Sequence, residues 1–159
     1  MQVVFSVNND IVIDEAYGVA KVKSQAPMSN GNYHRIASVS KAITKQAIEE
    51  LVRRGKISYS NLVFKDIFTE FHVDAKMAKV TVKHLCDHTV GAWGTNTRAV
   101  DPMFNYLSLK GAQFIQTVLD DTELEVDPGH SWCYSNFGYF LLGRVIEKVT
   151  SMLYIDYIK

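Results

Sequence analysis

The sequence predicts an α+β fold, in which an N-terminal β-hairpin precedes a mainly helical region. Two β-rich runs, residues 3–7 and 11–16, flank Asn8-Asn9-Asp10, and these three residue types tolerate the left-handed backbone of tight turns. From residue 36 onward apolar residues recur every three to four positions, which is typical of amphipathic helices. Because a two-stranded hairpin is marginal by itself in water, we expect further strands or helices to pack against it.

Composition narrows the functional class. The chain has 159 residues, of which 47% are hydrophobic and 21% are charged, so it can bury a core. Basic and acidic residues number 17 each, and this balance argues against a nucleic-acid partner. We expect a small-molecule or peptide substrate instead.

The cysteines and the apolar segments say little about the cellular location of the protein. Cys86 and Cys133 have neither metal-ligand spacing nor the density of a disulfide scaffold, so we expect two free thiols. The N-terminus has no basic leader, and polar residues interrupt every apolar stretch before it reaches spanning length. No signal peptide or membrane span is predicted, which is compatible with a cytoplasmic or organellar location.

The first long helix begins near Ile36 and is closed by Arg53, Arg54 and Gly55. Cations favour the C-terminal end of a helix, and glycine supplies the left-handed residue just past it. Two shorter helices are expected over residues 62–71 and 81–88, the second with Thr81 as its N-cap.

The second half of the chain is expected to be helical with connecting turns. Residues 91–101 are typical of a loop, residues 111–119 of a helix, and Asp127-Pro128-Gly129 of a turn. Residues 137–149 carry apolar side chains on nearly every face, which indicates a buried helix. A last helix starts after Ser151 and runs to the end of the sequence without a capping signal.

Ser38-Val39-Ser40-Lys41 places a hydroxyl and an amine three residues apart at the start of the first long helix. Both then project from one face and can meet. A serine needs an adjacent base to become a nucleophile, and a lysine can act as that base if its surroundings lower its pKa from about 10.4. The structural alternative is an N-cap serine beside a solvated lysine, and this short pattern is also common by chance.

A second motif, Tyr134-Ser135-Asn136, lies on the turn that leads into the most apolar helix. A phenol there can relay a proton, and an amide can bind the amide of a substrate. Alternatively, Asn136 caps the helix and Tyr134 packs against it. The same triplet, Tyr59-Ser60-Asn61, follows the charged end of a helix and is expected to be structural.

Together these motifs resemble the serine β-lactamases and penicillin-binding proteins, in particular the class C β-lactamase-related branch that includes esterases and D-amino peptidases. The resemblance covers nearly the whole chain. Its motifs, in order, are Ala16-Tyr17-Gly18, His34-Arg35-Ile36-Ala37-Ser38-Val39-Ser40-Lys41, Val80-Thr81-Val82-Lys83-His84-Leu85, His88-Thr89-Val90-Gly91, Pro128-Gly129, Tyr134-Ser135-Asn136-Phe137-Gly138-Tyr139 and Leu141-Leu142-Gly143.

The resemblance implies a β-lactamase/transpeptidase-like fold and a serine hydrolase that forms an acyl-enzyme. It implies that Ser38 is the nucleophile, Lys41 its base, Tyr134 a proton relay and Asn136 the contact to the substrate amide, with no metal or organic cofactor. The substrate class stays open among β-lactams, D-amino peptides and small esters.

The third motif of that family, a Lys-Thr-Gly or His-x-Gly triplet on a late strand, does not occur after Asn136. We therefore expect residues 1–159 to be one partial domain, with residues 1–20 as the hairpin of its sheet and residues 36–159 as its helical region. The strands that would complete the sheet are then missing, and the activity of this chain by itself is in doubt.

Two other functions remain open. One is a related chain that has lost catalysis and serves as a binding or scaffold protein. The other is a metal-binding protein, because His84 and His88 lie one helical turn apart as zinc ligands do. Against the metal site, position 85 is leucine where a metalloprotease has its glutamate base.

Overall fold

The computed structural model describes residues 1–94 and 101–159, which form two units, 1–37 and 38–159. Strands occur in the first unit and helices in the second, so the expected α+β composition is confirmed. The predicted loop over residues 91–101 lies in part outside the described residues, since residues 95–100 are not among them.

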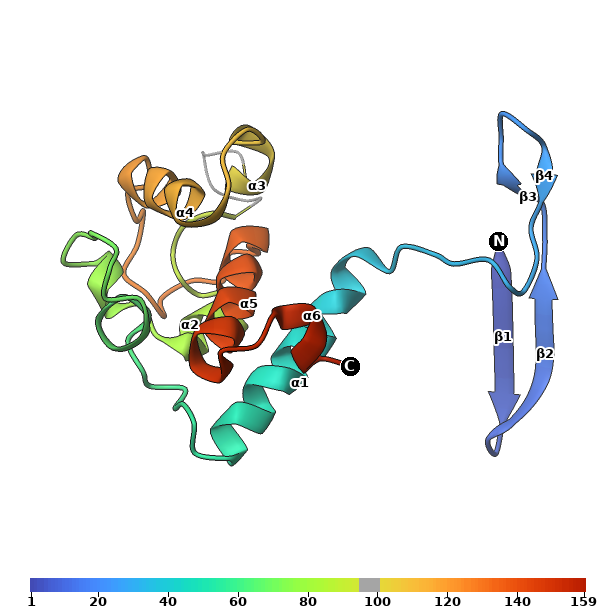
Figure 1. Ribbon diagram of the computed structural model, residues 1–159, viewed down its shortest axis with the longest axis horizontal. Helices are drawn as coiled ribbons and strands as arrows, with labels where there is room; N and C mark the ends of the chain where they lie inside the picture. The colour runs from blue at the N-terminus through green and yellow to red at the C-terminus, as the bar shows by residue number, and fades with distance from the viewer. Residues whose placement is uncertain (95–100) are drawn as a thin grey trace. The chain divides into compact units, whose positions relative to one another are not determined.

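The N-terminal unit is built on the predicted hairpin. Strand β1 (Gln2–Val7) pairs with β2 (Asp10–Ala16) in antiparallel register, with Val4 opposite Asp14 (Figure 1). Asn8 and Asn9 have φ angles of 52° and 69°, the left-handed conformation expected at a tight turn. The position and the turn of the hairpin were therefore predictable from local chemistry.

Two further strands were not predicted. Strands β3 (Val19–Lys21) and β4 (Ala26–Pro27) pair antiparallel in a second small sheet. Each is too short for a period-two pattern to stand out in the sequence. The apolar side chains of the hairpin stay largely exposed, so it buries little apolar surface within its own unit; they are Val4, Phe5, Val7, Ile11, Val12 and Ile13.

A 3₁₀ turn, η1 (Ala37–Val39), begins at the last residue of the first unit and continues into helix α1 (Ser40–Arg53) of the second. Its buried face is made by Thr44, Ile48 and Leu51. Gly55 follows the helix with a φ of 67°, as its closing signal predicted.

The predicted helix over residues 62–71 is shorter than expected. A single π-helical turn, η2 (Val63–Ile67), stands there, and a carboxylate oxygen of Asp66 accepts a hydrogen bond from the Leu62 amide at 2.8 Å. Such local side-chain bonds to the backbone compete with continued helix. A 3₁₀ turn, η3 (Met77–Lys79), then leads to helix α2.

Helix α2 (Val82–Cys86) lies within the predicted range 81–88 and has the predicted N-cap. The hydroxyl of Thr81 accepts a hydrogen bond from the His84 amide, while the His84 ring accepts one from the Thr81 amide. The helix ends before residue 88, because His88 takes a left-handed φ of 59°.

Helices α4 (Gly111–Asp120) and α5 (Asn136–Thr150) match the two predicted long helices. The last helix, α6 (Tyr154–Tyr157), is shorter than predicted, because it begins at Tyr154 and ends before Ile158. Between α4 and α5, the His130 amide donates to the Asp127 carbonyl at 3.2 Å in the expected turn. Helix α3 (Pro102–Asn105) was not predicted. Among the described residues, no helix is long and apolar enough to cross a membrane.

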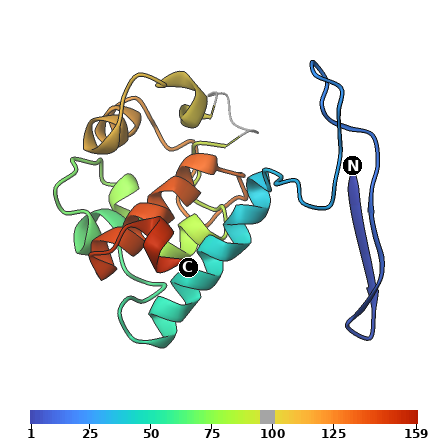
Figure 2. The same ribbon diagram turned by 45° about the vertical axis from the view of Figure 1, so that its right-hand side comes forward.

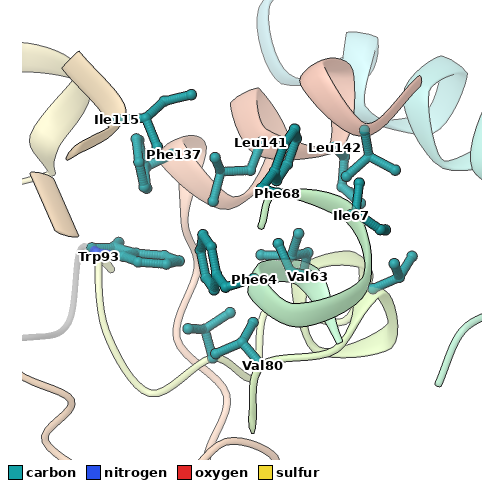
Figure 3. Packing of buried hydrophobic residues seen from close by; sticks show 14 of the residues in the cluster. Val63, Phe64, Ile67, Phe68, Val80, Trp93, Ile115, Phe137, Leu141 and Leu142 are labelled. Atoms are coloured by element: carbon teal, nitrogen blue, oxygen red, sulfur yellow. The ribbon is translucent and has the colours of Figure 1, made fainter. Parts of the chain in front are cut away.

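Helix α5 forms the centre of the second unit and contacts α1, α2 and α6 (Figures 1 and 2). Phe137 at its start is fully buried, and the rings of Trp93, Phe114 and Phe140 surround it at centroid distances of 4.8, 5.6 and 6.0 Å. Figure 3 shows Phe137, Leu141 and Leu142 in the same packed core as residues of η2. The predicted buried helix is therefore confirmed.

Both cysteines are free, as expected, and the structure shows that both are buried. Burial raises the pKa of the Cys86 thiol to about 12 and also raises the pKa of Cys133. Since the thiolate is the reactive form, neither cysteine is poised as a nucleophile.

Replacing Phe137 by alanine should lower the free energy of unfolding by about 3–5 kcal/mol, because it removes the side chain on which three rings pack. Urea unfolding followed by circular dichroism measures this change. Phe104, which is 66% exposed, gives a matched Phe→Ala control with little expected effect. Equal midpoints for the two variants would contradict the central place of Phe137.

Candidate active site

Ser38 and Lys41 lie together at the start of the first long helix. Ser38 belongs to the turn η1, and Lys41 to the first turn of α1. The Lys41 Nζ donates a hydrogen bond to the Ser38 Oγ across 3.2 Å. Ser38 is exposed and Lys41 half-buried, so the hydroxyl is accessible and the amine is partly shielded.

The second motif meets the first at the start of α5. Ser135 caps this helix, because its hydroxyl accepts a hydrogen bond from the Gly138 amide at 2.9 Å. The flanking residues turn toward α1: the Tyr134 hydroxyl donates to the Ser38 Oγ at 2.6 Å, and the Lys41 Nζ donates to the Asn136 Oδ1 at 2.7 Å. The structure thus brings all four predicted site residues into one hydrogen-bonded cluster.

The other triplet behaves as the sequence predicted. In Tyr59-Ser60-Asn61 the Asn61 Oδ1 accepts a hydrogen bond from the Ser58 amide at 2.6 Å, which closes a local turn. Its contacts are therefore structural, and context distinguishes the two identical triplets.

Lys41 shapes the electrostatics around Tyr134. Its Nζ lies 4.8 Å from the centroid of the Tyr134 ring and 5.6 Å from that of Tyr139. Burial raises the pKa of the Tyr134 phenol, but hydrogen bonding with Lys41 and Ser38 and the positive charge of Lys41 outweigh it. The net result is a Tyr134 pKa below its ordinary value near 10.

His88 supports the segment that carries Tyr134. Its Nδ1 accepts a hydrogen bond from the Ser135 amide at 3.1 Å, and its carbonyl accepts one from the Cys133 amide at 2.6 Å. Its ring also packs on Tyr134 and Tyr139 at centroid distances of 4.6 and 4.8 Å. The sequence alone did not predict this support from His88, whose backbone takes a left-handed φ of 59°.

Asp101 is a second residue that sequence reasoning missed. Its side chain is buried, and its Oδ2 accepts a hydrogen bond from the Asn136 Nδ2 at 2.7 Å. The pair Asp101-Pro102 is itself a signal for the start of a helix, with an N-cap followed by proline at the first position. That signal locates α3 but does not reveal the contact with Asn136.

Comparison with known proteins identifies the family. The family model described as Beta-lactamase matches residues 1–159. The chain belongs to the beta-lactamase family. Its curated relatives include penicillin-binding protein 4* of Bacillus subtilis, which is 28% identical over 94% of this chain and 32% of that protein. Protein flp of Staphylococcus aureus is 29% identical over 95% of this chain and 30% of that protein.

Solved structures agree with this beta-lactamase assignment. An octameric penicillin-binding protein homologue from Pyrococcus abyssi is 28% identical and covers 95% of this chain, with a TM-score of 0.76 over 35% of that chain. A class C beta-lactamase in complex with cefoxitin has the same fold at 22% identity, with a TM-score of 0.79 over 99% of this chain and 41% of its own. The expected β-lactamase/transpeptidase-like fold is confirmed, and the chain spans roughly a third of the curated relatives' length.

The rings of His84 and His88 are both engaged in hydrogen bonds with the backbone. The Nδ1 of His84 accepts from the Thr81 amide and that of His88 from the Ser135 amide. Over the described ranges, 1–94 and 101–159, no group of three or more potential metal ligands is found. Nothing in the geometry of these two residues favours the metal-binding alternative.

The stability of the helical unit should fall as the pH drops from 7 to 5. Burial and the positive charges of Lys41 and Lys45 lower the pKa of His88. A histidine whose folded pKa is depressed stabilises the fold above its unfolded pKa of about 6.5, and this contribution is lost as the pH falls through the folded value. Thermal unfolding at stepped pH measures the loss.

His84 contributes in the same direction, because burial lowers its pKa too. The variant His88→Gln should therefore flatten the pH dependence between pH 7 and 5 in part, whereas His130→Gln, at an exposed position, should leave it unchanged. An identical slope in the wild type and His88→Gln would contradict the role given to His88.

Proposed function

We propose that this chain carries the nucleophile of a serine hydrolase that acts through an acyl-enzyme, with Ser38 as the attacking residue. The observation that carries the proposal is the position of the Ser38 Oγ, 2.6 Å from the Tyr134 hydroxyl and 3.2 Å from the Lys41 Nζ. A serine hydroxyl becomes a nucleophile when a neighbouring group removes its proton. Both neighbours lie within the distance that such a transfer needs.

Tyr134 is the better placed of the two to take that proton. The Lys41 Nζ donates hydrogen bonds to the Ser38 Oγ at 3.2 Å and to the Asn136 Oδ1 at 2.7 Å, so its shorter contact is to Asn136 and not to Ser38. Tyr134 lies closer to the Ser38 Oγ, and its lowered pKa favours the phenolate that a base requires. We therefore give Lys41, which the sequence alone presents as the base, the role of holding Tyr134 ready to accept the proton.

The reaction then has two steps. The Ser38 Oγ attacks an ester or amide carbonyl, its proton passes to Tyr134, and backbone N–H groups hold the tetrahedral oxyanion. The bond to the leaving group breaks as that group takes the proton from Tyr134. Water then attacks the acyl-enzyme by the same proton path in reverse, which releases the acid and restores Ser38.

The names of several relatives support a narrower substrate class. Two of them are named as penicillin-binding proteins, and a D-stereospecific amidohydrolase from Streptomyces is 28% identical over 79% of this chain and 39% of its own, with a TM-score of 0.63. These names favour β-lactams and D-amino amides over simple esters. The Asn136 Nδ2 uses one hydrogen on Asp101, and its second hydrogen is suited to a substrate carbonyl.

A fluorophosphonate probe should form a covalent adduct on Ser38, because the phosphorus centre takes the place of the carbonyl and fluoride leaves. Intact-mass spectrometry detects the adduct, and peptide mapping locates it. Ser38→Ala should abolish labelling, while Ser40→Ala, two residues away in the same motif, should retain it. Labelling elsewhere, or none in the wild type, would favour the binding or scaffold alternative.

Labelling should also show the link between Lys41 and Tyr134 in its pH dependence. The rate should rise with pH as Tyr134 loses its proton, and Lys41→Ala should move the midpoint to higher pH, because it removes the hydrogen bonding and the positive charge of Lys41 that lower the Tyr134 pKa. Lys45→Ala, one turn along α1, is the matched control and should keep the wild-type midpoint. A midpoint that Lys41→Ala leaves in place would show that Tyr134 is not the base.

A further inference from the structure

We propose that Asp101 is a positioning residue, which fixes the orientation of the Asn136 amide and, through it, the place of Lys41 beside Ser38. This inference rests on the proposed function. Asp101 is only 4% exposed and lies directly before α3. Its Oδ2 accepts from the Asn136 Nδ2 at 2.7 Å, and the Asn136 Oδ1 accepts from the Lys41 Nζ at 2.7 Å.

The hydrogen-bond partners of residue 101 require a carboxylate at this position. The Oδ1 of Asp101 accepts from the Met103 amide at 3.0 Å, and its Oδ2 accepts from Asn136, so both oxygens face N–H donors. An ionised carboxylate has acceptors on both sides, whereas an amide has one acceptor and one donor. An asparagine at position 101 would therefore set a donor against a donor at one of the two contacts.

The same matching of donors and acceptors determines the orientation of the Asn136 side-chain amide. With its Nδ2 on the Asp101 carboxylate, its Oδ1 faces the Lys41 ammonium. Turning the amide over would place its NH₂ against the ammonium and its oxygen against the carboxylate, which is unfavourable at both ends. In a half-buried site these contacts are stronger than in water, so Asp101 selects one orientation.

The orientation of the Asn136 amide affects Ser38 through the position of Lys41. The Asn136 Oδ1 holds the Lys41 Nζ where it also donates to the Ser38 Oγ at 3.2 Å and lies over the Tyr134 ring. If the amide turned over, Lys41 would lose an acceptor and move away from this position. Small misplacements of a reacting group can cost up to about a hundredfold in rate.

The test separates this role from the cap that Asp101 provides to α3. In Asp101→Ser the hydroxyl can still accept from the Met103 amide, since serine is a good N-cap, but it is too short to reach Asn136. Asp101→Ser should keep the unfolding midpoint near that of the wild type and slow labelling of Ser38 by about tenfold to a hundredfold. Unchanged labelling in a well-folded Asp101→Ser would overturn the inference.

A double-mutant cycle with Asn136 gives a readout that a purely structural role would not move. If Asp101 acts through Asn136, Asp101→Ser should slow labelling in the wild type but cause little further loss in an Asn136→Ala background. If Asp101 served only the fold, the two losses would add, and the inference would fail. Labelling that is fast in the wild type and insensitive to Asp101 would leave the proposed function intact.

Nuclear magnetic resonance tests the orientation even where labelling of the wild type is absent and the proposed function has failed. The side-chain NH₂ signals of Asn136, assigned by their loss in Asn136→Ala, should shift upfield in Asp101→Ser as the bond to the carboxylate is lost. Asn61, whose Nδ2 donates to Asp66 at 3.1 Å, is the internal control and should not move. Asn136 signals that are the same in both proteins would refute the positioning role.

Discussion

The packing of α5 against α1 determines whether the two motifs can meet. Ser38 and Lys41 begin one helix, Tyr134 and Asn136 begin the other, and 95 residues separate Lys41 from Asn136 in the chain. The buried side chains Leu141, Leu142, Val145 and Ile146 hold α5 within the core. Because packed cores tolerate little displacement, the hydrogen-bond distances at the helix starts depend on this contact.

Hydrogen bonds between helices also fix their positions around this core. The Tyr139 hydroxyl donates to the Cys86 carbonyl at 2.9 Å, which joins α5 to the end of α2. Thr44 of α1 and Tyr154 of α6 share a hydrogen bond of 2.7 Å. Each bond satisfies a polar group that packing would otherwise leave buried without a partner, so the same contacts stabilise the fold and restrict rotation of α1 and α5.

Two neighbouring residues, His88 and Asp101, hold the four motif side chains in place. His88 accepts a hydrogen bond from the Ser135 amide before α5 and packs on Tyr134, while Asp101 accepts a hydrogen bond from the side-chain amide of Asn136. Neither takes part in the proposed proton transfer. Reactive groups must be held close to their working geometry, and supports of this kind provide that restraint.

Much of the fold could be predicted because its signals are local. The alternation and Asn turn of the β1–β2 hairpin, the periodicity of α1 and α5, and the Thr81 cap each depend on residues a few positions apart. The exceptions also have local causes. Strands β3 and β4 and helix α3 are too short to produce a periodic pattern, and Asp66 bonds to the Leu62 amide where the sequence alone predicts a longer helix.

The sequence by itself determined which residues can carry the chemistry. The spacing in Ser38-Val39-Ser40-Lys41 puts two side chains on one helical face, and the resemblance of the ordered motifs to one family pointed to Tyr134 and Asn136 as their partners. Only the tertiary structure decided which side chains support them. His88 and Asp101 reach the α5 segment across 47 and 35 residues, and contacts at such separations come from packing, which leaves no periodic or capping pattern in the sequence.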